Sequence, residues 1–276
     1  MGRTIFAGIE PAPGHPEILR IVAPNPGAFT LEGTNTYVVG PIGRFRDAVY
    51  VIDPGPADEA HVAAVREAVA GRGELAGVLL THSHADHSAA VPLLGAELLW
   101  GAVGSGDEAS SESGAGAGEE GWPPQREPEL VGPFRIVATP GHAVDHVALL
   151  FGDVCFCGDL VLGRGSSFVP PDGGSLAAYM ESLLRLRQLD LDLLCPGHGP
   201  YVTEPKAKLE EYLAHRLDRE RRLVEALEGG ERSRDRLLDL VWDDVPAELR
   251  PAAGLVMQAH LEKLEFEDRL PDDLRD

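Results

Sequence analysis

The sequence predicts an α+β domain over residues 1–203, followed by a small all-helical module over residues 204–276. Up to Gly199, short apolar runs that are typical of strands alternate with runs of helical periodicity, and most strands end in turns rich in glycine or proline. From Tyr201 onward the periodicity is helical only. Polar residues directly follow several strands of the first domain, which indicates a site where strand ends meet.

Each element of the first domain has a local pattern behind it. Two strands over 35–39 and 48–52 are expected to pair antiparallel, and the helix over 57–70 follows them. His61, within that helix, is expected at the surface. A second helix is predicted over 175–189, with Ser175 as its N-cap. The other strands are expected at 17–22, 77–80, 134–138, 147–151, 154–157 and 193–195.

Residues 101–128 differ from their surroundings. This stretch consists mainly of glycine, serine, alanine and acidic residues, with almost no bulky apolar side chain. It cannot bury enough surface to offset its ordering entropy. We therefore expect a mobile surface insertion here, and the alternative that it forms a lid over the site stays open.

The C-terminal module has the size of a three-helix, winged-helix-like unit. Helices are predicted over 206–227 and 234–242, and in two pieces over 246–264. Winged helices often bind DNA, but this tail carries 20 acidic residues against 13 Lys and Arg from Tyr201 on. Its charge argues against nucleic acid, so packing against the first domain or a homodimer interface is expected instead.

The composition of the chain argues against several classes of function and partner. The net charge of −21 repels polyanions, and no run of about 18 apolar residues exists, so no membrane partner is expected. The N-terminus lacks an apolar segment of the secretory type, which favours a cytoplasmic protein. Three cysteines are too few for a disulfide framework, and they are expected to be small buried apolar residues.

The side chains best suited to metal binding lie in one loop directly after the strand at 77–80. His82, His84, Asp86 and His87 fall within six positions. Buried imidazoles and carboxylates need partners, and a group of this density usually finds them in metal ions. His82 and His84 can grip one ion, whereas Asp86 and His87, one turn further on, can face a second. The loop therefore predicts a metal site.

Three further polar residues follow other strands. His142, Asp159 and His198 each stand in a turn punctuated by glycine or proline, where the backbone can bring a side chain into a shared pocket.

In its ordered motifs the chain resembles the metallo-β-lactamase superfamily: Asp53, His82-x-His84-x-Asp86-His87, His142, Asp159 and His198. The resemblance implies a four-layer αββα sandwich. It also implies a dinuclear site with His82, His84 and His142 on the first zinc, Asp86, His87 and His198 on the second, and Asp159 as the bridging carboxylate. Asp53 is similar to the buried acid that orients the metal loop from behind.

A closer resemblance is to the beta-lactamase-like protein 2 group, and it covers nearly the whole chain except the insertion. It is carried by the segment Phe29 to Tyr37, by Thr139-Pro140-Gly141-His142, by Pro196-Gly197-His198-Gly199-Pro200, and by Ala214-His215-Arg216. Side chains expected near the substrate are Asn35, Arg164 and His215.

The resemblance implies a metallo-hydrolase in which a metal-bridging hydroxide attacks the substrate and Asp86 can accept a proton. We expect two zinc ions per chain, although iron and manganese fit the same ligands. The acidic surface favours a thioester or ester of a small metabolite or acyl carrier. The main alternative is a single-stranded RNA endoribonuclease. A true β-lactamase and a non-enzymatic binding module fit less well, because Asp stands at position 159 and all seven ligands are present.

Overall fold

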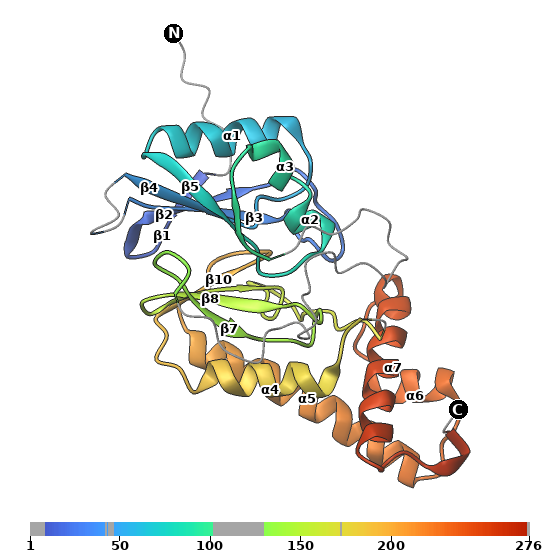
Figure 1. Cartoon of the computed structure of the whole chain (residues 1–276). Coiled ribbons are helices and arrows are strands. Elements are labelled where there is room, and N and C mark those ends of the chain that lie inside the picture. The colour runs from blue at the N-terminus through green and yellow to red at the C-terminus, as the bar shows by residue number, and fades with distance from the viewer. Residues whose placement is uncertain (1–8, 42, 44–46, 102–129, 172, 275–276) are drawn as a thin grey trace, which may run out of the picture.

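A computed structural model describes residues 9–41, 43, 47–101, 130–171 and 173–274, and its strands form two sheets (Figure 1). The predicted insertion lies outside the described residues except for Gly101. The first sheet has six strands in sequence order, β1 (Ile9–Ala12), β2 (His15–Val22), β3 (Asn35–Val39), β4 (Ala48–Ile52), β5 (Glu74–Leu79) and β6 (Leu98–Trp100). The second has the order β10–β9–β8–β7, with β7 (Arg135–Ala138), β8 (Val147–Phe151), β9 (Val154–Gly158) and β10 (Leu193–Pro196).

The two sheets face each other and helices cover their outer sides, so the domain has the four layers αββα that the resemblance implied (Figure 1). On the outer face of the first sheet lie α1 (Glu59–Ala70) and the short α3 (Val91–Leu94), while the one-turn α2 (Ala85–Ser88) stands at the sheet edge. The second sheet is covered by α4 (Leu176–Arg187) and by the first half of α5 (Pro205–Glu228).

Side chains alternate along each strand, so the apolar residues of one strand contribute to two separate cores. Along β3, Tyr37 and Val39 point into the space between the sheets, whereas Val38 points toward α1. Successive side chains of a strand alternate between faces, so one apolar run can serve two layers. Between the sheets, the Tyr37 ring lies edge-on to Phe156, with 5.2 Å between ring centroids.

Most predicted elements are confirmed, and the exceptions have physical reasons. β3 and β4 pair antiparallel as expected, and Ser175 caps α4 through its hydroxyl. His61, however, is buried, because its ring contacts the Thr36 hydroxyl at 2.8 Å on the sheet side of α1. The strands β1 and β6 were not predicted, since four and three residues are too few to show a period.

The C-terminal module begins within a helix that it shares with the sandwich. Leu209 and Leu213, in the first half of α5, belong to the core beneath the second sheet. Leu223 and Leu227, in its second half, pack with Trp242 in a separate core. The two cores therefore divide in the middle of α5, not between residues 203 and 204. The module is completed by α6 (Arg234–Val241), the 3-10 turn η1 (Ala247–Leu249), α7 (Arg250–Phe266) and the turn η2 (Asp272–Leu274).

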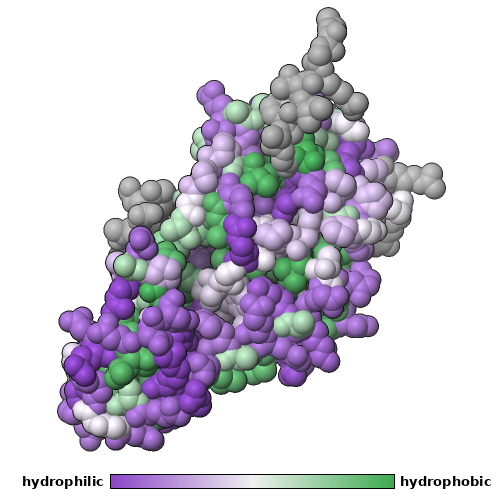
Figure 2. Space-filling model, turned by 180° about the vertical axis from the view of Figure 1, so that it is seen from behind, coloured by the Kyte–Doolittle hydropathy of each residue, from purple (hydrophilic) through white to green (hydrophobic). Residues whose placement is uncertain are grey.

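Hydrophilic residues cover most of the face shown in Figure 2, including the C-terminal module. Within the described ranges, no helix combines the length and the apolar composition that crossing a membrane requires. All three cysteines are buried and free, as the sequence led us to expect.

The core between the sheets should dominate stability. We expect Phe156→Ala to lower the free energy of unfolding by about 3–5 kcal/mol, because the fully buried ring would leave a cavity. Phe266→Ala makes the same chemical change at a side chain that is 84% exposed, and should change it by no more than about 0.5 kcal/mol. Denaturant titrations of both variants check this, and equal losses would contradict it.

Candidate metal centre

Five strands of common direction end at one edge of the sandwich, and each delivers a polar side chain there. β4 pairs parallel with β5 in the first sheet, and β9 pairs parallel with β10 in the second. A backbone bridge between Thr34 and His198 joins the sheets at this edge. The side chains brought together follow β4, β5, β7, β9 and β10, and are Asp53, His82, His84, Asp86, His87, His142, Asp159 and His198.

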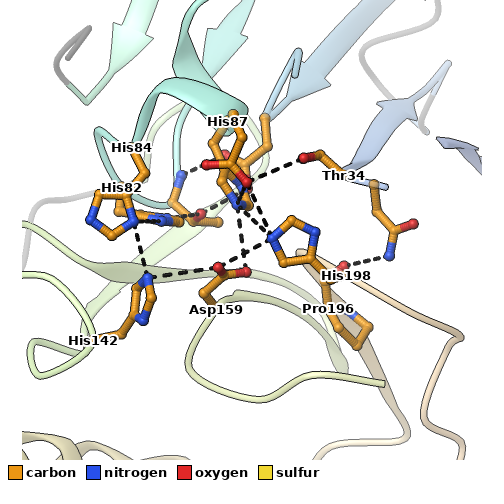
Figure 3. A network of polar contacts seen from close by, with 12 residues as sticks. Thr34, His82, His84, His87, His142, Asp159, Pro196 and His198 are labelled. Carbon is orange, nitrogen blue, oxygen red and sulfur yellow. Dashed lines mark hydrogen bonds and ion pairs between the residues drawn. The ribbon is translucent and has the colours of Figure 1, made fainter. Parts of the chain in front are cut away.

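Three histidines form the first group (Figure 3). His84 Nδ1 lies 3.0 Å from His82 Nε2 and 3.1 Å from His142 Nε2. These three nitrogens all lie within 4.8 Å of one another, a spacing that suits the ligands of one cation.

Asp86, His87 and His198 form the second group. Asp86 Oδ2 lies 3.6 Å from His87 Nε2 and 3.3 Å from His198 Nε2, and the two nitrogens are 3.4 Å apart. This group again supplies three converging ligand atoms.

The Asp159 carboxylate stands between the two groups (Figure 3). Its Oδ2 lies 3.6 Å from His142 Nε2 and 3.2 Å from His198 Nε2, while its Oδ1 lies 3.5 Å from His87 Nε2. Among the described residues, the buried Oδ1 has no hydrogen-bond partner. A buried carboxylate oxygen without a donor is costly, so this donor set fits the binding of divalent cations.

Asp53 holds the metal loop from behind. Its Oδ1 accepts a hydrogen bond from the Thr81 backbone N–H at 2.8 Å, and its Oδ2 accepts one from the Thr81 hydroxyl at 2.7 Å. Oδ2 also accepts from His87 Nδ1 at 3.0 Å. Because Nδ1 of His87 is engaged in this hydrogen bond, Nε2 is the nitrogen that remains to ligate a metal once it has lost its proton.

The same arrangement recurs at His82, His142 and His198. His142 Nδ1 donates to the Phe168 carbonyl at 2.7 Å, and His198 Nδ1 donates to the Gly33 carbonyl at 3.2 Å. His82 Nδ1 lies 3.0 Å from the Thr81 hydroxyl, which already donates to Asp53 and therefore accepts here. These partners orient the rings so that Nε2 points inward.

The pKa shifts have opposite directions in the two groups, downward at His82 and His84 and upward at His87 and His198. Burial, together with the neighbouring imidazoles, holds the pKa of His82 well below its usual value and lowers the pKa of His84 to about 4. In the second group, burial opposes the charged forms, but nearby Asp159 and Asp86 still raise the pKa of His198 to about 9. Likewise, Asp86, Asp159 and Asp53 outweigh burial and raise the pKa of His87 well above its usual value.

The carboxylates respond in the opposite sense. Although burial opposes ionisation, His198 and His87 keep the pKa of Asp159 well below its usual value. Burial is likewise overcome at Asp86, whose pKa His87 and His198 lower to about 2. Asp86 and Asp159 are thus ionised and require positive charge beside them, from protons on the imidazoles or from a cation.

Three supporting residues were not recognised in the sequence. A Cβ at Gly197 would lie 2.3 Å from Asp159 Oδ1 and 2.6 Å from His87 Cε1, so no other residue fits there. Thr34 donates to Asp86 Oδ2 at 3.4 Å. Gly197 stands beside a recognised ligand and could have been suspected, whereas Thr34 and Thr81 carry no signal of their own.

The residues expected near the substrate have different positions. Asn35 is buried, and its amide donates to the carbonyls of Pro196 at 2.9 Å and Gly199 at 2.8 Å, so it supports the turn that carries His198. Arg164 is exposed and forms an ion pair with Glu32 at 2.5 Å. His215 lies on the exposed side of α5 and, in the part of the chain that the structure describes, has no hydrogen bond to the metal-ligating residues.

Comparison with known families decides the identity of this fold. Residues 29–198 match the model of the metallo-beta-lactamase superfamily, and residues 233–273 match the beta-lactamase associated winged helix domain. The chain belongs to the metallo-β-lactamase superfamily. Members of the superfamily are generally metal-dependent hydrolases whose fold binds divalent metals, in agreement with the His and Asp groups found here.

Individual proteins that are similar to this chain have names that refer to lactamases. The chain is 31% identical over 271 residues to the beta-lactamase-like protein 2 homolog of Drosophila melanogaster, covering 92% of this chain and 89% of that protein. It is 36% identical over 227 residues to the lactamase-like protein adaB of Aspergillus niger, covering 80% of this chain but 66% of that protein. A beta-lactamase domain protein from Burkholderia ambifaria shares the fold, with a TM-score of 0.72 at 22% identity over 98% of this chain and 94% of that one.

Metal binding should compete with protons in this metallo-β-lactamase site. The pKa of His198 is raised to about 9 and the pKa of His87 is raised well above its usual value, so both residues must release protons before they can ligate a metal at neutral pH. We expect the apparent affinity for zinc to rise between pH 6 and pH 9. Calorimetry in buffers of different ionisation enthalpy should detect this proton release, and a pH-independent affinity would contradict the assignment.

Proposed function

We propose that the protein is a dinuclear zinc hydrolase that cleaves a thioester or ester of a small metabolite or an acyl carrier. The observation that carries the proposal is the position of Asp159, whose carboxylate contacts ligands of both metal groups. Imidazole nitrogens and carboxylate oxygens in this number suit zinc, although iron or manganese could occupy the same donors.

The chemistry divides between the cations and the chain. Bound divalent cations supply Lewis acidity, which polarises a carbonyl and lowers the pKa of a water molecule to about 7. Asp159 holds the two groups of ligands at a fixed separation. Asp86, whose side chain is 30% exposed, is the group that accepts a proton and passes it to solvent. Asp53 and the carbonyls of Gly33 and Phe168 keep the imidazoles in their ligating orientation.

An aromatic pair beside the metal centre, one ring of which is exposed, supports an apolar acyl group as substrate. Phe29 is 54% exposed, and its ring lies 5.3 Å from that of Phe168. The Phe168 carbonyl holds His142, so this pair stands next to a metal ligand. The net charge of −21 disfavours the binding of a polyanion and so favours an acyl group over RNA.

A substrate panel tests the reaction. We expect turnover of acyl-CoA or acyl-glutathione thioesters by the zinc-loaded protein, and loss of at least about 100-fold in rate with His84→Ala or Asp159→Ala, because each removes a metal ligand. Labelled single-stranded RNA is tested with the same proteins. Cleavage of RNA without thioester turnover, lost in both variants, would replace the proposed function with that of an endoribonuclease.

The aromatic pair can be tested separately. Phe29→Ala should raise KM about tenfold for thioesters with long or aromatic acyl groups, because it removes apolar contact worth about 1.4 kcal/mol. KM for an acetyl thioester should stay unchanged. Phe29→Tyr keeps the ring and serves as the matched control. An equal change for acetyl and long-chain substrates would show that Phe29 supports the loop and does not bind substrate.

A further inference from the structure

A buried arginine of the C-terminal helix α5 contacts the loop that supports two metal ligands. Arg216 is 2% exposed, and its guanidinium donates a hydrogen bond to the Ser167 carbonyl. Within the described ranges, no carboxylate lies at ion-pair distance from it. A buried charge without a counter-charge costs stability, so fold stability alone does not account for this residue.

The residue that Arg216 holds is joined directly to the metal centre. The Ser167 hydroxyl donates to the Asp159 carbonyl at 2.5 Å. The next residue, Phe168, accepts the hydrogen bond of His142 Nδ1 through its carbonyl at 2.7 Å. One short segment therefore holds the backbone of Asp159 and the ring of His142, a ligand of the first group.

The other side of the guanidinium leads to the same two ligands. Arg216 lies over the ring of Tyr179 in α4, 5.4 Å from its centroid. The Tyr179 hydroxyl donates to the carbonyl of Leu160, the residue after Asp159, at 2.7 Å. The backbone of Tyr179 is so close to Gly141 that a Cβ there would lie 2.3 Å from Tyr179 Cα. Tyr179 thus limits the positions of the neighbours of Asp159 and His142.

One turn earlier on α5, Tyr212 holds the start of the same loop. Its hydroxyl accepts from the Leu162 N–H at 3.0 Å and donates to the Gly165 carbonyl at 2.8 Å. Side chains of α5 therefore fix residues 162–168 at both ends.

We propose that Arg216 is a positioning residue for the metal centre, assisted by Tyr212, and that helix α5, which the sandwich shares with the C-terminal module, thereby sets the metal affinity of a site to which it contributes no ligand. The proposal rests on the metal centre of the proposed function but not on the identity of its substrate.

The same helix offers a matched control. Arg219 is 4% exposed and also stacks on an aromatic ring, that of Trp242, at 5.7 Å. Its guanidinium, however, binds Asp244 through two hydrogen bonds of 2.6 and 2.8 Å within the module. Replacing it disturbs a buried arginine of α5 without touching the loop 162–168.

The test measures metal affinity on full-length protein. Metal-free wild type, Arg216→Gln and Arg219→Gln are titrated with Co²⁺, followed by its visible absorption, and with Zn²⁺ against a chelator. We expect affinity about 10–100-fold weaker for Arg216→Gln, with an altered Co²⁺ spectrum, and a change below about twofold for Arg219→Gln. Wild-type affinity in Arg216→Gln would overturn the proposal, as would equal losses in both variants, which would indicate general loosening.

A second variant covers the case in which Arg216→Gln does not fold. Tyr212→Phe keeps the buried ring and removes only the hydroxyl that fixes the loop, so it should fold and bind metal several-fold more weakly; unchanged affinity there would overturn the proposal. These readouts involve no substrate. A wild-type protein that binds metal but hydrolyses no thioester would contradict the proposed function alone.

Discussion

The site depends on positive charge that balances three carboxylates which lie close together and have little contact with water. Asp53, Asp86 and Asp159 approach one another at the edge of a sandwich, and all three contact His87. Carboxylates this close repel each other in a medium of low dielectric constant. The arrangement is stable only if positive charge stands between them. The raised pKa values of His87 and His198 meet this need with protons, and divalent cations meet it with more charge and fixed geometry.

The fold supplies the rigidity that such a balance needs. Each ligand follows a strand whose own residues are buried between the layers, and the inward-pointing nitrogens of His82, His87, His142 and His198 are set by a partner on the opposite ring atom. Two of those partners are backbone carbonyls, at Gly33 and Phe168, which cannot change rotamer. The ligating geometry is therefore largely a property of the backbone, prepared before a cation arrives.

Local patterns in the sequence predicted most strands and the metal loop, whereas the four-layer sandwich and the complete set of ligands followed from the resemblance to the superfamily. The run His82 to His87 is dense in ligands, and β3 to β5 show clear strand periodicity. Support roles leave no such pattern. Asn35 was expected near the substrate, but its amide donates both of its hydrogen bonds to carbonyls of the turn that contains His198. His61 was expected at the surface, because no pattern in the sequence around it indicates its contact with Thr36 of β3.

The shared helix limits how the two parts of the chain can be separated. The match to the winged helix domain begins at residue 233, yet α5 already enters the core of that module at Leu223 and leaves the core of the sandwich only after Leu213. A cut at either junction would strip apolar surface from one core or the other. The two cores therefore share one structural element, helix α5, and we expect them to unfold cooperatively.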